Sequence, residues 1–242
     1  MRVLLLGGTA EARRLAATLH PAVEVISSLA GRVPNPALPV GRVRIGGFGG
    51  AEAFRQYLRD NRIDAVVDAS HPFAAEITAR AARVCADMGM PHLVLTRAAW
   101  DTDNAILVSS TAEAAETLER QRYARVFLTT GRSGVAAFAD STAWFLIRVV
   151  TEPDPKSLPR RHTLLLSRGP YRYDDELALM RENRIDALVT KNSGGELTRA
   201  KLDAAAALDL PVVMVQRPPP PDGISPVGTV AEAAAWVNRR AR

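Results

Sequence analysis

The feature that most constrains the fold of this 242-residue chain is an internal repeat. The residues NRIDA at 61–65 return unchanged at 183–187. Upstream, RVLLLGG at 2–8 resembles RVFLTTG at 125–131, so the likeness extends well beyond the shared pentapeptide. A period of about 120 residues is far longer than the 20–50 residues of a solenoid repeat. The repeat therefore predicts one domain-sized unit that occurs twice.

Short apolar runs alternate with helical segments in both copies, which predicts two similar Rossmann-like α/β domains, each with a parallel sheet, and a ligand cleft between them. Their expected bounds are residues 1–122 and 123–242. The tails of the copies, at 110–115 and 229–234, each fit the Ser/Thr-x-x-Glu capping box that begins a helix. Because the tails are equivalent in sequence, either can pack on either copy, and an exchange of strands between the domains stays open.

The composition is typical of a globular protein without disulfides. Hydrophobic residues make up 47% of the chain, yet no stretch approaches the roughly 20 apolar residues of a membrane span. Cys85 is the only cysteine, so neither a disulfide framework nor a thiolate metal cluster is expected. The apolar run at the N-terminus is too short for a signal peptide. We therefore expect a cytoplasmic protein, with a monomer favoured and no metal site.

The chain carries a net charge of +5, and its basic residues are almost all arginines, with only three lysines. This bias has two interpretations, which are the base composition of the genome and a ligand with several carboxylates or phosphates. Arginine binds such groups in a bidentate manner. The basic residues are scattered and aromatic residues make up 5%, so a nucleic acid is not an expected partner.

A glycine turn follows the first apolar run, residues 2–6, and an alanine-rich helix follows the turn. The first N–H groups of a helix lack partners within it, and the helix dipole favours negative charge, so this turn is a candidate phosphate site. The turn departs from the G-x-G-x-x-G fingerprint, which leaves a bare tight turn as the alternative. The predicted cofactor-binding residues here are Gly7, Gly8, Thr9, Ala10, Glu11 and Ala12.

The end of the second predicted strand, residues 23–28, discriminates between the two nicotinamide cofactors. An acidic residue near this position usually accepts the ribose 2′-OH of NAD. Here Ser28 ends the strand and Arg32 follows, which favours the 2′-phosphate of NADPH. The alternative for Arg32 is an ordinary surface charge on a proline-rich loop.

Two more strand ends complete the predicted cofactor site of the first half. Residues 46–50 contain four glycines, which indicates a sharp bend or a close approach to a ligand. The predicted strand that follows the repeated NRIDA leads into DASHPFA at 68–74, and ligands gather at such strand ends in open α/β sheets. His71 has two interpretations, a cofactor-contacting or structural histidine being favoured over a general acid, and Pro72 suits the start of a helix. The predicted residues are Gly46, Gly47, Ser70, His71, Pro72 and Phe73.

The second half repeats these strand ends with different residues. Its first turn reads TTGRS at 129–133, so Thr130 replaces one glycine of the pair and Arg132 follows the other. We therefore expect this turn to bind a different ligand. The predicted strand after its copy of NRIDA ends in TKNSGG at 190–195. Lys191 there either binds phosphate, carboxylate or cofactor or is a chance occurrence. The predicted cofactor-binding residues of this half are Lys191, Asn192, Ser193 and Gly194.

Together the motifs resemble the precorrin-6A reductase family, NADPH-dependent enzymes of cobalamin (vitamin B12) biosynthesis. The resemblance covers essentially the whole chain. It rests on GGTAEA at 7–12, AGR at 30–32, GGF at 46–48, DASHPFA at 68–74, TGR at 130–132, GPY at 169–171 and TKNSGG at 190–195. It implies that NADPH delivers a hydride to a ring double bond of a polycarboxylated tetrapyrrole, with the two halves holding cofactor and macrocycle.

Arginines near the strand ends of the second half then have carboxylates of the macrocycle as expected partners. The predicted substrate-binding residues are Thr130, Gly131, Arg132, Ser133, Arg148, Tyr171 and Lys191. No residue stands out as the catalytic acid, and solvent is the expected source of the proton.

Three alternatives remain open in the sequence. A non-catalytic NADP-sensing protein would bind the cofactor without consuming it. A transferase acting on a nucleotide-activated substrate would need a base, for which only His71 is available. The cobalt-precorrin-6A reductases catalyse the same reduction on a ring that already holds cobalt, and the motifs do not separate them from the metal-free enzymes.

Overall fold

The computed structural model describes residues 1–31 and 36–241 and divides the chain into two compact units. The first unit contains Met1–Ala98 and Pro218–Arg242, and the second contains Ala99–Arg217. Arg32 lies outside the described residues. None of the helices in the described part of the chain has both the length and the apolarity needed to cross a bilayer.

The first unit is a five-stranded parallel sheet in the order β3-β2-β1-β4-β5, with helices on both faces. This order is that of a Rossmann half, with β1 at the centre. Strands β2 and β3 are added on one side of β1, and β4 and β5 on the other. The elements are β1 (Arg2–Leu6), α1 (Ala10–Leu19), β2 (Glu24–Leu29), β3 (Arg42–Ile45), α2 (Ala51–Asp60), β4 (Ala65–Asp68), α3 (Ala75–Asp87), β5 (His92–Val94) and α7 (Val230–Ala241).

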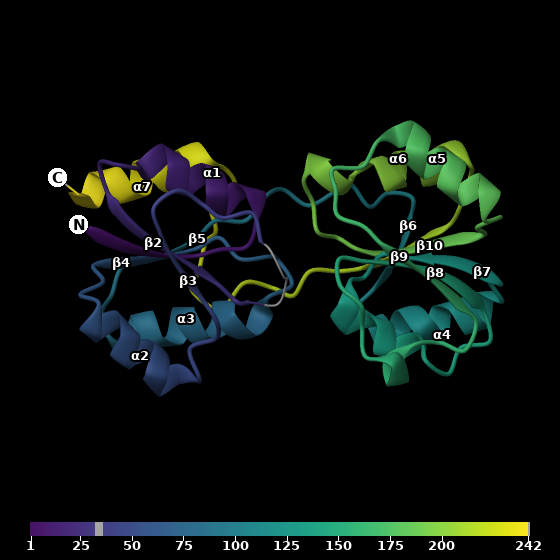
Figure 1. Cartoon of the computed structure of the whole chain (residues 1–242), viewed down its shortest axis with the longest axis horizontal. Helices are drawn as coiled ribbons and strands as arrows, with labels where there is room; N and C mark the ends of the chain where they lie inside the picture. Colours follow the sequence, from purple (N-terminus) through teal and green to yellow (C-terminus); the bar gives the residue numbers. More distant parts are fainter. Residues whose placement is uncertain (32–35, 242) are drawn as a thin grey trace. The chain divides into compact units, whose positions relative to one another are not determined.

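Alternating side chains of the central strands fill two cores, one on each face of this sheet. Val3 and Leu5 of β1 pack with α1 and α7, while Leu4 and Leu6 pack with α2 and α3. Figure 1 shows these two helix pairs on opposite faces of the sheet. A strand buried on both faces must be apolar throughout, which is why β1 reads as an unbroken hydrophobic run.

The second unit is a six-stranded parallel sheet in the order β6-β11-β10-β7-β8-β9. Helices α5 and α6 cover one face, and α4 with the 3₁₀ turn η1 covers the other (Figure 1). The elements are β6 (Ala105–Val108), α4 (Thr111–Gln121), β7 (Arg125–Leu128), η1 (Arg132–Phe138), β8 (Trp144–Val149), η2 (Pro155–Ser157), β9 (His162–Leu166), α5 (Tyr173–Glu182), β10 (Ala187–Lys191), η3 (Glu196–Thr198), α6 (Ala200–Ala207) and β11 (Val212–Val215).

The tails of the two sequence copies lie in each other's units. Strand β6, which lies just before residues 110–115 near the end of the first copy, pairs with β11 of the second unit. In return, Val227 from the tail of the second copy forms a parallel bridge with Leu95 beside β5, and α7 packs on α1. The unit boundaries therefore fall at 98/99 and 217/218, and the expected boundary at 122/123 lies inside the second unit. Two similar parallel-sheet α/β domains were predicted correctly, but the compact units are not the same as the sequence copies.

Both predicted capping boxes are present. The Ser110 hydroxyl accepts a hydrogen bond from the Glu113 backbone N–H at 3.1 Å, and Thr229 does the same for the Glu232 N–H at 3.2 Å. The Glu232 carboxylate returns to the Thr229 N–H at 2.9 Å, whereas that of Glu113 reaches the Ser109 N–H at 2.7 Å. These contacts satisfy N–H groups that the first helical turn leaves without partners.

Candidate functional site

In the first unit, three neighbouring strands end in one row at the carboxyl edge of the sheet. Leu6 of β1 is in register with Ser28 of β2, and Ser28 is in register with Arg44 of β3. The glycines that follow are fixed by the same sheet, because the Gly7 N–H donates to the Ser28 carbonyl at 2.9 Å and the Gly46 N–H to that of Leu29 at 2.8 Å. The predicted glycine segments thus lie at the edge where open α/β sheets bind ligands.

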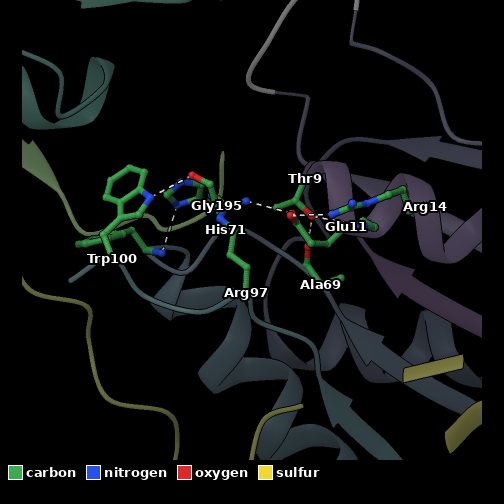
Figure 2. Close-up of polar contacts among 10 residues, drawn as sticks. Thr9, Glu11, Arg14, Ala69, His71, Arg97, Trp100 and Gly195 are labelled. Atoms are coloured by element: carbon green, nitrogen blue, oxygen red, sulfur yellow. Dashed lines mark hydrogen bonds and ion pairs between the residues drawn. The ribbon is translucent and has the colours of Figure 1, made fainter. Parts of the chain in front are cut away.

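The turn between β1 and α1 is held by Thr9. Its hydroxyl accepts a hydrogen bond from the Ala12 N–H at 3.1 Å and donates to the Ala69 carbonyl at 2.7 Å, which ties the turn to the end of β4 (Figure 2). Gly8 has φ +110°, a conformation that favours glycine, and a Cβ there would meet nothing within 4 Å. The backbone at Gly8 is therefore open to a ligand.

Glu11 places a carboxylate in the first turn of α1. It forms ion pairs with Arg97 at 2.9 Å and Arg14 at 3.2 Å (Figure 2). Burial by itself would raise the pKa of Glu11, but a hydrogen bond from its own backbone N–H and the charges of Arg97 and Arg14 together lower it. Glu11 is thus ionised, and its two arginines balance a charge that would otherwise repel a phosphate at this helix end.

The loop after β4 forms a second part of this edge. The Asp68 carboxylate accepts a hydrogen bond from the Ser70 N–H at 2.9 Å, and the His71 Nδ1 accepts one from the Phe73 N–H at 3.3 Å. The His71 side chain is exposed, with its ring centroid 5.9 Å from that of Phe73. Pro72 lies in a turn and α3 begins only at Ala75, so the expectation that Pro72 opens the helix was wrong by one turn.

In the second unit, β10 ends at Lys191, whose side chain is half-buried. Burial lowers the pKa of Lys191 because the charged form loses hydration. Gly194 follows with φ +66°, and Trp100 fixes the turn by donating its indole N–H to the Gly195 carbonyl at 2.9 Å (Figure 2). The position of Lys191 at a strand end agrees with its predicted role.

The side-chain amide of Asn192 is bonded to the protein backbone. Its side chain is buried, accepts a hydrogen bond from the Trp100 N–H at 2.9 Å and donates to the Trp100 carbonyl at 3.2 Å. These paired bonds satisfy the backbone of residue 100 across 92 positions of sequence. The Asn192 side chain therefore shapes the turn, and a cofactor contact at this residue stays a prediction.

The turn after β7, residues 129–133, lies next to the turn that follows Lys191, because β7 and β10 are paired. Arg132 and Ser133 are exposed, and Gly131 has φ +77°. Thr130 is buried instead, and a Cβ at Gly134 would come within 2.6 Å of its hydroxyl. The Thr130 side chain thus packs beneath η1, and its buried hydroxyl has no hydrogen-bond partner within the described residues. Its role as a substrate contact stays a prediction.

Arg148 was predicted to bind a carboxylate of the substrate, but it binds one of the protein. It is buried in β8, and its two terminal nitrogens donate to both carboxylate oxygens of Glu176 at 2.6 and 2.9 Å. The guanidinium also lies 3.9 Å from the ring centroid of Tyr171, whose hydroxyl donates to the Ser167 carbonyl at 3.1 Å. Arg148 and Tyr171 therefore form part of the framework of the unit.

Sequence reasoning missed Arg44, whose guanidinium bridges Ser28 and the glycine run. Its only signal in the sequence was a cation one residue before the end of a strand that leads into four glycines. Among the described residues, no group of three or more His, Cys, Asp or Glu side chains is arranged to hold a metal ion.

The strand order and the open glycine turn place the chain in the class of Rossmann-like α/β proteins that bind nucleotides at the carboxyl edge of a parallel sheet. Comparison with known proteins narrows this class. The family model "Precorrin-6x reductase CbiJ/CobK" matches residues 2–238, and the chain belongs to this family.

Two curated relatives and one solved structure agree with this assignment. The precorrin-6A reductase of Mycobacterium tuberculosis is 68% identical over 98% of this chain and 97% of its own. That of Rhodococcus erythropolis is 54% identical over 100% and 99%. A solved structure titled "CobK precorrin-6A reductase" has a TM-score of 0.90 and 36% identity, covering 99% of this chain and 96% of that one. The family, the fold and the reductase activity indicated by the motifs are thereby confirmed, and a reductase of this kind uses a nicotinamide cofactor.

Proposed function

We propose that this chain reduces one ring double bond of precorrin-6A with NADPH, in cobalamin biosynthesis. The observation that carries the proposal is the open glycine turn at the carboxyl edge of the first sheet, in a member of the precorrin-6x reductase family. NADPH in particular, the division of roles between the units and the residues named below are parts of the proposal.

The first unit is suited to the cofactor. A hollow beside the glycine turn is lined by Gly7, Gly8 and Ser27, among other residues. The Ser27 hydroxyl is buried and has no hydrogen-bond partner within the described residues, which leaves a polar group for a ligand to satisfy. Gly7 and Gly8 would hold phosphate oxygens through their backbone, Ala10 with the start of α1 would favour the negative charge, and Ser28 would face the ribose.

These residues would hold NADPH, which would supply a hydride to one carbon of the ring double bond and leave as NADP⁺. The loop of Ser70, His71 and Phe73 would pack on the uncharged nicotinamide side, because it offers a hydroxyl and two rings at the same sheet edge. A proton must reach the second carbon. We assign it to solvent, and His71 keeps the role of a cofactor contact.

The second unit is suited to a polycarboxylate. Arg132 and Ser133 follow β7 and Lys191 ends β10, so two cations follow paired strands. Each would form a charge-assisted hydrogen bond to a carboxylate of the macrocycle. A hydride transfer needs orientation above all, and these contacts supply it without chemistry of their own. We propose that the enzyme works as a cytoplasmic monomer.

The test is anaerobic incubation of the chain with NADPH and either precorrin-6A or its cobalt complex, followed at the nicotinamide absorbance band. We expect oxidation of NADPH with the metal-free substrate, at one equivalent of NADPH per macrocycle. Oxidation with the cobalt complex alone would assign the chain to the cobalt-dependent branch. Binding of NADPH without oxidation by either substrate would favour the NADP-sensing alternative.

A further inference from the structure

We propose that Arg44, with Ser28 and the backbone at Gly47, forms the site for the 2′-phosphate of NADPH. This inference rests on the proposed function and names the residue that selects the phosphorylated cofactor. A 2′-phosphate is the only feature by which NADPH differs from NADH, so a residue that binds it determines which of the two is used.

The position of Arg44 in the sheet fits this role. Arg44 lies in register with Ser28, which lies in register with Leu6, the residue before the glycine turn. Two strand spacings, on the order of 10 Å, therefore separate Arg44 from the end of β1. A dinucleotide with its phosphates at the glycine turn extends its adenosine ribose toward the end of β2. Arg44 is one strand further along the same edge.

Contacts on several sides hold the Arg44 guanidinium in place. Its Nη1 donates to the Ser28 hydroxyl at 2.9 Å and to the Gly46 carbonyl at 2.8 Å, and its Nη2 donates to the Gly47 carbonyl at 3.0 Å. The guanidinium lies 3.9 Å from the ring centroid of Phe48 and 5.0 Å from that of Tyr57. These contacts use three of the five N–H donors of a guanidinium, so a phosphate would be bound through the Nε–H and the second Nη2–H.

The charge of Arg44 is not balanced by a carboxylate. Within residues 1–31 and 36–241, no Asp or Glu forms an ion pair with it, whereas Arg97 and Arg148 have Glu11 and Glu176 as partners. Arg44 is also only half-buried, so an incoming anion can reach it. A cation that is ordered, partly exposed and not neutralised is what a phosphate dianion requires.

Gly47 supplies a second, independent observation. Gly46 has φ +125°, so its backbone alone explains why glycine is used there. Gly47 lacks a positive φ, and a Cβ there would meet nothing within 4 Å. Neither conformation nor packing within the described protein requires a glycine at 47. The open space at Gly47, next to the Arg44 guanidinium, is explained if a ligand occupies it.

The experiment measures binding without turnover. Wild type, Arg44→Ala and Arg44→Lys are titrated with NADPH and NADH by nicotinamide fluorescence, and with adenosine 2′,5′-bisphosphate and 5′-AMP by calorimetry. We expect Arg44→Ala to weaken NADPH and the bisphosphate about 10- to 100-fold, because a charge-assisted contact is lost, and to change NADH and 5′-AMP by about twofold or less. Arg44→Lys should retain part of the preference. Arg42→Ala is the matched control, since it removes an exposed arginine from the start of the same strand and should change neither cofactor.

Gly47→Ala tests the site without removing any hydrogen-bonding group. It should fold normally, as judged by its melting temperature, and weaken NADPH more than NADH. If Arg44→Ala proves too unstable to titrate, Gly47→Ala and Arg44→Lys decide the matter alone.

Three results would overturn the assignment. One is an equal loss of affinity for NADPH and NADH in the Arg44 and Gly47 variants, and another is unchanged affinity for both cofactors in them. A third is loss of the preference in Arg32→Ala but not in Arg44→Ala, which would place the phosphate at Arg32. In all three, a wild type that still oxidises NADPH with precorrin-6A leaves the proposed function intact. A wild type that binds neither cofactor would refute both.

Discussion

The buried ion pair of Arg148 and Glu176 gives a sharp stability prediction for the second unit. Both side chains are buried, with relative exposures of 7% and 1%, and two short hydrogen bonds join them. Replacing Glu176 by Leu leaves the Arg148 cation buried between Phe127 and Tyr171 without its carboxylate. Removing one partner of a buried pair typically costs about 3–5 kcal/mol, which is the loss expected in the free energy of unfolding.

The double variant Arg148→Met/Glu176→Leu separates the pair from the charge left behind. With both charges gone and apolar volume in their place, the loss should shrink to within about 1–2 kcal/mol of wild type, since an apolar replacement of a buried pair is often neutral or stabilising. The matched control is Asp203→Ala, which breaks the exposed pair between Asp203 of α6 and Arg199, the residue before that helix, and should cost less than about 1 kcal/mol.

Urea unfolding followed by tryptophan fluorescence is the assay, because Trp100 and Trp144 both lie in the second unit. A loss below about 1 kcal/mol in Glu176→Leu would refute the reasoning, since Arg148 would then be hydrated or neutralised by another route. A double variant as unstable as the single one would show that packing volume, and not the unpaired charge, sets the cost.

Three further predictions concern the site and the sheet edges. Lys191→Met should raise KM for precorrin-6A with kcat little changed, because a charge contact away from the reacting carbon stabilises the ground state and the transition state equally. A fall in kcat of about a thousandfold at constant KM would instead indicate a general acid. Burial lowers the pKa of His92, with Asp68 partly opposing it, so the unfolded chain takes up a proton below the ordinary pKa of 6.5 that the folded chain resists. Stability should therefore fall as the pH drops from 7 to 5, and urea titrations should show a smaller fall in His92→Leu. Thr229→Ala removes the cap of α7 and should cost about 1 kcal/mol in the unfolding of the first unit, measured by Trp236 fluorescence, unless that helix end is already frayed.

The strands and the glycine turns could be predicted from the sequence because their signals are local. Unbroken apolar runs, such as residues 3–6 in β1 and 212–215 in β11, predict strands buried on both faces. The repeat predicts that the second copy follows the same order. The assignment of β6 and α7 to their units could not be predicted, because the tails at 110–115 and 229–234 carry the same capping signal and match either sheet equally well. Which sheet a tail joins depends on contacts between residues far apart in the sequence, and a local pattern does not contain that information.

The candidate site residues came from equally local signals. Gly8, His71 and Lys191 were proposed because each lies at or shortly after the end of a strand, and their roles stay predictions. Arg148 was misassigned because its partner, Glu176, is 28 residues further along the chain in the first turn of α5. Arg44 was overlooked because its proposed role depends on its contacts with Ser28 and Phe48, which the sequence does not reveal. A charged residue near a strand end predicts a ligand contact only when the protein supplies no counter-charge.

The exchange of tails sets the order in which the chain can become compact on the ribosome. Residues 99–217 are contiguous, so the second unit can close as soon as they have emerged. The first unit must wait for residues 218–242, because Ala233, Ala234 and Val237 of α7 cover the apolar face that α1 and β1 present. Nascent chains generally fold their N-terminal domain first. Here the segment that is synthesised first is completed last, and the apolar face of its sheet stays uncovered until α7 has been synthesised.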